Sequence, residues 1–213
     1  MKTILFQGDS ITDVGRDRKD PDLGRGYPLL VSARLGADHP TEYSFVNRGI
    51  SGNRIVDVYA RIKADIINLN PDVMSILIGV NDVWHEEFYQ NGVDNAKFGK
   101  IYGMLIEEIK AALPDIKIII LSPYLCKGHV TFDPEKPELW EHFSHEVALR
   151  AETSKRIARR YHLPFVDLQK VFDDAVASTD GDASYWTPDG VHPTFRGHEL
   201  IAREWVKTFN RMK

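Results

Sequence analysis

The sequence has almost no cysteine and no long apolar run. Cys126 is the one cysteine among 213 residues, so the chain cannot form an intrachain disulfide and does not depend on an oxidising compartment. No apolar run approaches the length of a membrane-spanning helix, and the first ten residues, MKTILFQGDS, lack the apolar core of a signal peptide. We therefore expect a cytoplasmic protein without a membrane partner.

The sequence also lacks an excess of basic residues. It has 27 lysines and arginines against 31 aspartates and glutamates, a formal net charge of −4, and no basic stripe that would neutralise phosphates. Nucleic acid is therefore not an expected partner. Hydrophobic residues make up 43% and charged residues 27% of the chain, as in ordinary globular proteins, and the length suits one α/β domain over residues 1–213.

Short apolar runs alternate with longer segments of helical periodicity, which predicts strands joined through helices into a parallel sheet. The expected strands are residues 3–7, 43–47, 72–78, 117–121 and 164–167. Apolar residues spaced by three and four predict a helix over residues 55–69, and similar patterns predict helices over residues 102–113, 139–161 and 197–212. Residues 124–137 contain glycine and two prolines, which predict a long loop.

Polar segments follow the predicted strands at four places, three directly after a strand and the fourth after the fifth strand and its helix. They are Gly8-Asp9-Ser10, Asn47-Arg48-Gly49, Gly79-Val80-Asn81-Asp82 and Asp189-Gly190-Val191-His192-Pro193. Ligands of open parallel sheets bind outside the carboxyl ends of the strands. We therefore expect these four segments to meet at one edge of the sheet.

Ser10, His192 and Asp189 fit the roles that acyl transfer requires, namely a nucleophile, a base and a group that orients the base. Ser10 lies where a strand turns toward a helix, so its hydroxyl can stand free at the edge of the sheet. Asp189 and His192 are three residues apart in a loop with glycine and proline, a spacing that permits a direct hydrogen bond. We predict that the three side chains form a catalytic triad.

The developing oxyanion of acyl transfer needs hydrogen-bond donors. The predicted donors are the backbone N–H groups of Ser10 and Gly49 and the side-chain amide of Asn81. Asp9 is expected to support the Ser10 turn by hydrogen bonding. Purely structural interpretations also exist: Ser10 can cap a helix, Asn81 and Asp82 can do the same, and Gly49 can be a turn residue that needs positive φ.

With these residues the chain resembles the SGNH hydrolases, also called the GDSL esterase family, over almost its whole length. The four blocks read GDSIT, NRGISGNR, GVND and DGVHP, with isoleucine in place of the leucine of GDSL. The serine, glycine, asparagine and histidine of the family name match Ser10, Gly49, Asn81 and His192. Asp189 lies three residues before this histidine. The resemblance implies a flavodoxin-like three-layer α/β/α fold with a parallel sheet of five strands, usually in the order 2-1-3-4-5.

The stretches GDSITDVGR, NRGISGN and SILIGVNDVW, and the VHP block with a tryptophan upstream, are similar to bacterial serine acetylxylan esterases. This likeness implies deacetylation of small xylo-oligosaccharides, no cofactor, no metal and a tendency to form homo-oligomers. Trp84 and Trp186 are predicted to contact substrate, because flat indole rings suit the faces of sugars, although either can equally be a packing residue. We predict a serine esterase that hydrolyses small acyl esters through an acyl-enzyme.

Three other functions fit parts of the sequence. A lysophospholipase- or thioesterase-like acylhydrolase would use the same triad for longer acyl chains, but the best lid candidate, residues 126–142, is too polar to cover an apolar groove. A metal-dependent phosphoesterase would need hard-cation ligands, for which the candidates are Asp9, Asn81, Asp82 and His192, but it lacks the paired Asp-x-His and Gly-Asn-His segments. A carbohydrate-binding module would leave the triad residues unexplained. The Gly-x-Ser-x-Gly elbow of α/β-hydrolases is absent.

Overall fold

The computed structural model describes residues 1–19 and 21–212, and its strands form one sheet. The strands are β1 (Lys2–Gly8), β2 (Tyr43–Asn47), β3 (Val73–Leu77), β4 (Lys117–Leu121) and β5 (Phe165–Val166). Their order in the five-stranded sheet is β2-β1-β3-β4-β5, and every neighbouring pair is parallel. The structure confirms the predicted strands to within one residue at either end.

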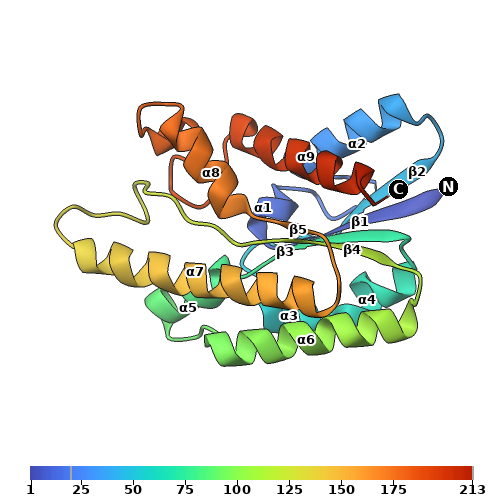
Figure 1. Cartoon of the computed structure of the whole chain (residues 1–213), viewed down its shortest axis with the longest axis horizontal. Coiled ribbons are helices and arrows are strands. Elements are labelled where there is room, and N and C mark those ends of the chain that lie inside the picture. The colour runs from blue at the N-terminus through green and yellow to red at the C-terminus, as the bar shows by residue number, and fades with distance from the viewer. Residues whose placement is uncertain (20, 213) are drawn as a thin grey trace.

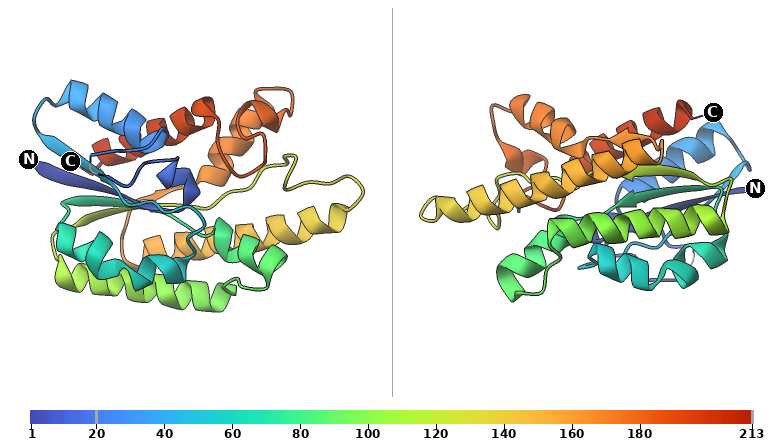
Figure 2. Two further views of the ribbon diagram at one scale, coloured as in Figure 1. Left: turned by 180° about the vertical axis from the view of Figure 1, so that it is seen from behind. Right: turned by 60° about the horizontal axis from the view of Figure 1, so that its bottom comes forward.

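Helices cover both faces of the sheet, so the sheet is the middle one of three layers, as Figures 1 and 2 show. The layer on one face contains α2 (Tyr27–Asp38), α8 (Leu168–Ala177) and α9 (Phe195–Asn210). The layer on the other face contains α3 (Ile55–Ala60), α4 (Ile62–Asp65), α6 (Asn95–Ala112) and α7 (Pro137–Arg160). This α/β/α arrangement confirms the fold that the family resemblance implied.

Successive residues of each strand contact opposite helical layers. In β1, Ile4 and Phe6 pack in the core shared with α2 and α9, whereas Leu5 packs in the core shared with α3 and α6. All three side chains are fully buried, and burial of one such side chain stabilises a fold by about 1.5–3 kcal/mol. Burial on both faces explains why these strands read in the sequence as continuous apolar runs.

The single helix predicted over residues 55–69 is wrong. The structure divides this segment into α3, α4 and the 3₁₀ turn η1 (Ile67–Leu69). The chain leaves helical geometry at Arg61, with φ −109° and ψ 17°, and again at Ile66, with φ −135° and ψ −68°. The buried face is as predicted, because Ile55, Ile62 and Ile66 all pack in the same core. Periodicity detects a buried face but does not reveal a bend within it.

The other predicted helices correspond to α6, α7 and α9, although α6 begins at Asn95 rather than at residue 102. Four helices had no predicted bounds, namely α1 (Ser10–Asp13), α2, α5 (Val80–Tyr89) and α8. The short turn η2 (Ala183–Tyr185) was not predicted. The predicted long loop is confirmed, since residues 122–136 form no helix or strand. Within residues 1–19 and 21–212, no helix is both long and apolar enough to cross a membrane.

The strand order changes direction at the edge of the sheet where the candidate site lies. β1 pairs with β2 on one side and with β3 on the other, so the chain connections leave the carboxyl ends of β1 and β3 in opposite directions. Gly8 and Leu77 are paired at these two ends. The helices α1 and α5, which follow β1 and β3, therefore begin at the same edge of the sheet (Figure 1).

Candidate active site

Ser10 is the first residue of the short helix α1, directly after β1. Gly8 allows the tight turn before it, because a Cβ atom there would lie 2.4 Å from Leu77 O and 2.4 Å from Thr12 Oγ1. Asp9 caps the helix by accepting a hydrogen bond of 3.0 Å from the Ile11 N–H. The cap is thus Asp9, and the alternative interpretation of Ser10 as the cap is wrong. Ser10 remains half-exposed at the edge of the sheet.

The loop of Asp189 and His192 approaches Ser10 from the far end of the chain. The Asp189 Oδ1 atom accepts hydrogen bonds from the backbone N–H groups of Val191 at 2.8 Å and His192 at 2.7 Å, which closes the turn. Asp189 Oδ2 lies 2.6 Å from His192 Nδ1, and His192 Nε2 lies 2.8 Å from Ser10 Oγ. With the proton on Nδ1, the imidazole donates to the carboxylate and accepts from the serine hydroxyl.

The pKa values of Asp189 and His192 are displaced in opposite directions. The hydrogen bond to Asp189 raises the pKa of His192, and this effect exceeds the opposing effect of burial. Burial by itself would raise the pKa of the Asp189 carboxyl, but the hydrogen bonds from the His192 side chain and the two backbone N–H groups hold it below its ordinary value. The carboxylate therefore stays ionised and stabilises a protonated imidazole.

Ser10 and Asn81 both offer N–H groups at this edge of the sheet. Ser10 begins α1, and the N–H of the first helical residue has no acceptor within its helix. The Asn81 side chain lies in the first turn of α5, and its Nδ2 atom donates to the Asn53 carbonyl at 3.2 Å. An amide NH₂ group has two protons, so the second N–H of Asn81 is not used by this bond.

Gly49 has a different environment from the one predicted. Its backbone N–H donates to the Asn47 Oδ1 atom at 2.8 Å, so this donor already has a partner within the protein. Gly49 is not among the glycines with positive φ, which contradicts its alternative interpretation as a turn residue of that kind. A Cβ atom at this position would lie 2.5 Å from Asp13 N. Glycine is therefore required because its loop packs directly against α1.

Asp82 is fully buried and contacts the main chain of another helix. Its two carboxylate oxygens accept from the N–H of Ile55, the first residue of α3, at 3.1 and 3.2 Å. Burial raises the pKa of this carboxyl to about 8. The N-terminal cap of α5 is Gly79, so Asp82 caps α3 and not its own helix.

In the part of the chain that the structure describes, no cluster of three or more His, Cys, Asp or Glu side chains is arranged to hold a metal ion.

Trp84 and Trp186, the two predicted substrate contacts, both pack against the protein. The Trp84 ring lies 4.7 Å from the Phe88 ring and 5.8 Å from the Phe143 ring, measured between centroids. The Trp186 indole N–H donates to Thr179 Oγ1 at 3.1 Å. Both side chains are only partly buried. These contacts account for the two rings by packing, and a sugar contact stays a prediction.

Sequence reasoning missed the segment that supports the base. The loop after β4 runs along the Asp189 loop: the Cys126 N–H donates to Gly190 O at 2.9 Å, and the His129 N–H donates to Pro188 O at 3.1 Å. The two loops touch at Gly128, where a Cβ atom would lie 2.2 Å from Gly190 N. Two glycines in distant loops were the only signal, and they do not identify each other in a single sequence.

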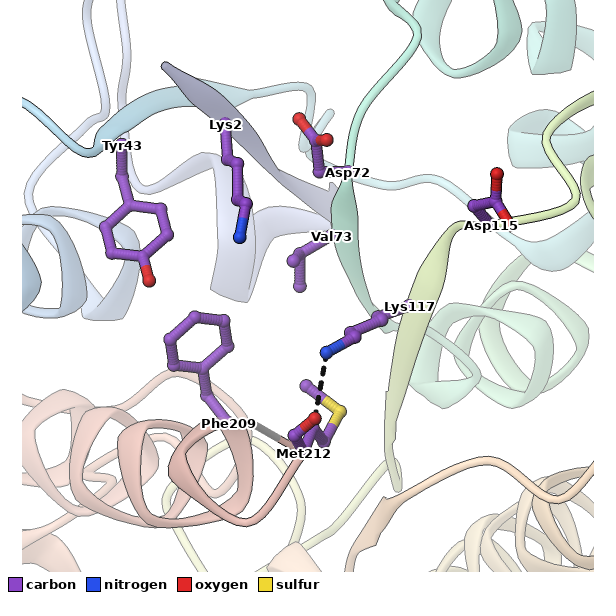
Figure 3. A pocket seen from close by; sticks show the side chains of 8 residues that line it. All are labelled: Lys2, Tyr43, Asp72, Val73, Asp115, Lys117, Phe209 and Met212. Atoms are coloured by element: carbon purple, nitrogen blue, oxygen red, sulfur yellow. Dashed lines mark hydrogen bonds between the residues drawn. The ribbon is translucent and has the colours of Figure 1, made fainter.

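A hollow of about 220 Å³ opens at the opposite end of the sheet (Figure 3). Its lining consists of Lys2, Tyr43, Asp72, Val73, Asp115, Lys117, Phe209 and Met212. Lys2, Val73 and Lys117 begin β1, β3 and β4, so this hollow lies at the amino ends of the strands. Among the described residues that line it there is no serine, cysteine or histidine, so they offer no pairing of a nucleophile with a base. The candidate site is the edge that carries Ser10.

The sequence matches a known protein family. The model of the GDSL-like lipase/acylhydrolase family matches residues 6–200, a region that contains all four predicted segments. The chain belongs to this family. The GDSL-like architecture is also found in solved structures that are similar over nearly the whole chain. A protein described as a GDSL-like lipase from Parabacteroides merdae superposes with a TM-score of 0.89 at 31% identity, covering 97% of this chain and 94% of that one.

Two further comparisons concern an esterase of Geobacillus stearothermophilus. An acetylxylan esterase from this organism is 33% identical over 228 aligned positions, covering 96% of each chain. The crystal structure of Axe2, an acetylxylan esterase from the same organism, superposes with a TM-score of 0.84 at 32% identity, covering 97% of this chain and 93% of that one. Family membership and this esterase homologue identify the GDSL-like protein as a carboxylic ester hydrolase.

Proposed function

We propose that the protein is a serine esterase in which Ser10 is the nucleophile, His192 the general base and Asp189 the residue that orients the imidazole. The observation that carries this proposal is the unbroken chain of hydrogen bonds from Asp189 through both ring nitrogens of His192 to Ser10, at 2.6 and 2.8 Å. A base must lie within hydrogen-bond distance of the proton that it removes. The raised pKa of His192 strengthens it as a proton acceptor.

The reaction proceeds through an acyl-enzyme. Neutral His192 takes the Ser10 proton as Oγ attacks the ester carbonyl, and Asp189 stabilises the imidazolium that forms. The imidazolium then gives this proton to the leaving alcohol as the ester C–O bond breaks. Water attacks the acyl-enzyme with His192 again as base, which releases the carboxylic acid and restores the Ser10 hydroxyl.

The tetrahedral oxyanion is stabilised by the Ser10 N–H and by the second amide proton of Asn81. Loss of one such donor typically lowers kcat about 10²–10³-fold. Gly49 contributes a third donor if its N–H breaks its hydrogen bond to Asn47 Oδ1 and donates to the oxyanion instead.

The proposed substrates are short acyl esters of carbohydrates, chiefly acetylated xylo-oligosaccharides. Similarity to an acetylxylan esterase over 96% of the chain supports this class. The loop after β4 and the start of α7 carry charged side chains that are exposed, Lys127, Glu135, Lys136 and Glu138. A long acyl chain needs a continuous apolar groove, worth about 0.8 kcal/mol for each buried methylene, and these residues do not provide an apolar cover.

The nucleophile is tested by covalent labelling. A serine-reactive phosphonate should modify Ser10, and peptide mass spectrometry should find the adduct in the peptide that contains it. The Ser51→Ala variant is the control. Ser51 is the serine of the NRGISGNR block, and its hydroxyl donates to the Asp13 carboxylate. Labelling should persist in Ser51→Ala and vanish in Ser10→Ala. An adduct on Ser51 would refute the assignment of Ser10.

The substrate class is tested with p-nitrophenyl acetate, butyrate and octanoate, and with acetylated xylo-oligosaccharides. We expect kcat/KM to fall from acetate to butyrate and to be lowest for octanoate, with discrimination of about 1–3 kcal/mol for each added methylene that the pocket rejects, as in other size-selective pockets. EDTA should leave these rates unchanged. An octanoate value at or above the acetate value would instead favour an acylhydrolase of lysophospholipase type with the same triad.

A further inference from the structure

Arg61 lies at the junction of α3 and α4, where the predicted helix is broken. Only 14% of its side chain is exposed. Its guanidinium group donates to the segment before Ser10: Nη2 lies 2.7 Å from Gln7 Oε1 and 3.4 Å from Gly8 O. Gln7 Oε1 also accepts from the Gly8 N–H at 3.0 Å, so the same oxygen joins Arg61 to the end of β1.

The other nitrogens of Arg61 reach the loop that contains Gly49. Nη1 donates to the Arg48 carbonyl at 2.8 Å, and Nε donates to the Asn53 Oδ1 atom at 2.9 Å. Asp65, one turn along the chain, accepts from Nη1 at 2.8 Å and holds the guanidinium in this orientation. The Asn53 carbonyl in turn accepts from the Asn81 amide at 3.2 Å. Asn53 therefore links Arg61 to Asn81, because its side chain accepts from Arg61 and its main-chain carbonyl accepts from Asn81.

We propose that Arg61 is a positioning residue for the oxyanion site, which it orders by fixing Asn53 so that the Asn53 carbonyl orients the Asn81 amide. This inference rests on the proposed function, in which the second amide proton of Asn81 meets the oxyanion. The planar guanidinium presents five donors in a fixed fork and can bond three segments at once, whereas a lysine ammonium offers one centre of charge. These long-range contacts also explain why the helix bends at Arg61.

The inference is tested by a double-mutant cycle on p-nitrophenyl acetate hydrolysis. Arg61→Met keeps much of the aliphatic stem and removes the guanidinium. In the otherwise native protein it should lower kcat about 10–100-fold with a smaller change in KM, because part of one oxyanion donor is lost. In the Asn81→Ala background the same substitution should change kcat less than about threefold, because two residues that act through one contact are not additive.

A second variant keeps the test decisive if Arg61→Met does not fold. Asn53→Ala removes the link between Arg61 and Asn81 but leaves the bonds of Arg61 to Gln7, Arg48 and Asp65. It should show the same dependence on Asn81. The matched control is Arg150→Met, since Arg150 is a buried arginine that, like Arg61, donates to a main-chain carbonyl, that of Val93 at 2.7 Å. This control should lower thermal stability but leave kcat nearly unchanged in both backgrounds.

Each other outcome contradicts a specific statement. If Asn81→Ala lowers kcat, but Arg61→Met and Asn53→Ala lower it by equal factors with and without Asn81, the positioning role is refuted and the proposed esterase mechanism stands. If Asn81→Ala by itself leaves kcat unchanged, the oxyanion role of Asn81 fails and the inference fails with it. If the phosphonate does not label Ser10 in the native protein, the proposed function is refuted independently of Arg61.

Discussion

Asp9 and Asp189 stand beside the proposed nucleophile and the proposed base, yet the protein surrounds these two carboxylates in opposite ways. Asp9 is 1% exposed, and burial raises its pKa to about 7 although the Ile11 N–H and His192 favour its ionised form. The Asp189 side chain is 23% exposed, and hydrogen bonds from His192 and the backbone hold its pKa below the ordinary value. One carboxyl serves the scaffold, while the other is a partly exposed negative charge paired with an imidazole.

The same contrast extends to the segments around them. On the nucleophile side, which comprises residues 7–13 and 47–61, the buried Asn47 and the mostly buried Arg61 donate to main-chain carbonyls. On the base side, which comprises residues 124–131 and 183–193, main-chain groups of two loops bond to each other, and 52% of the His192 side chain is exposed. Loss of a buried polar contact on the nucleophile side should therefore lower stability, whereas loss of the half-exposed Ser10 hydroxyl or a change on the base side should mainly lower activity.

The largest effect should come from Ser10→Ala, which removes one half-exposed oxygen. We expect kcat to fall about 10⁶-fold, as for the nucleophile of other serine hydrolases, with little change in the melting temperature. Steady-state kinetics and thermal unfolding provide the two measurements. Ser51→Ala should behave oppositely, with kcat retained and stability lowered, because Ser51 bonds the buried Asp13 carboxylate at 3.0 Å. Comparable activity losses in both variants would contradict the contrast between the two roles.

Asp189→Asn and Asp9→Asn compare the two carboxylates directly. Asp189→Asn should lower kcat about 10⁴-fold, because an amide favours the wrong imidazole tautomer. Asp9→Asn retains an oxygen that can accept from Ile11, so its loss of kcat should be much smaller. The pair is measured at a fixed pH with one substrate. If Asp9→Asn is as damaging as Asp189→Asn, Asp9 has a chemical role and not only a supporting one.

Gly128→Ala tests the support of the base by the loop after β4. The new Cβ atom would lie 2.2 Å from Gly190 N and 2.3 Å from Asp189 C, so the Asp189 loop must move. A displacement of about 1 Å in a catalytic group can lower the rate about 10²-fold, and we expect kcat/KM to fall by this order. Gly36→Ala in α2 is the control, since a Cβ atom there meets nothing within 4 Å. Equal activity of the two variants would show that the loop contact is dispensable.

The pH dependence of kcat/KM should follow the titration of His192. Only the neutral imidazole accepts the serine proton, so activity should rise with pH. The hydrogen bond to Asp189 raises the pKa of His192, so the midpoint should lie above the ordinary value of 6.5. The residual activity of Asp189→Asn should show a lower midpoint. An unchanged midpoint in that variant would mean that Asp189 does not stabilise the imidazolium.

The smallest expected effect concerns stability and involves Asp82. Burial raises the pKa of its carboxyl from 3.8 to about 8. Between these values the folded state binds more protons than the unfolded state, so the free energy of unfolding should fall as the pH rises. Asp82→Asn should flatten this dependence, leaving the part that Asp9 contributes. Urea unfolding at several pH values between 4 and 8 measures the slope, and an identical slope in the variant would contradict the assignment.

Much of the fold was predictable because burial leaves a direct pattern in the sequence. Strands that are covered on both faces consist of consecutive apolar residues, and all five were found in this way. The bend at Arg61 was not predictable, because it depends on hydrogen bonds to Gln7, 54 residues away. A helix was expected after β1, but the bounds of α1 were not predictable, since it is only four residues long and shows no helical period.

The sequence by itself determined which residue types follow each strand, and hence that Ser10, Asn81 and the Asp189–His192 pair lie at one edge of a parallel sheet. That inference needed only the positions of the strands along the sequence and the rule that ligands bind at carboxyl ends. The tertiary structure alone decided how these residues are held. In the tertiary structure the Gly49 N–H donates to Asn47, Arg61 bonds two loops, and Gly128 packs against Gly190. Such contacts depend on distances between segments that are far apart in the chain, or on side-chain orientations that sequence spacing does not define.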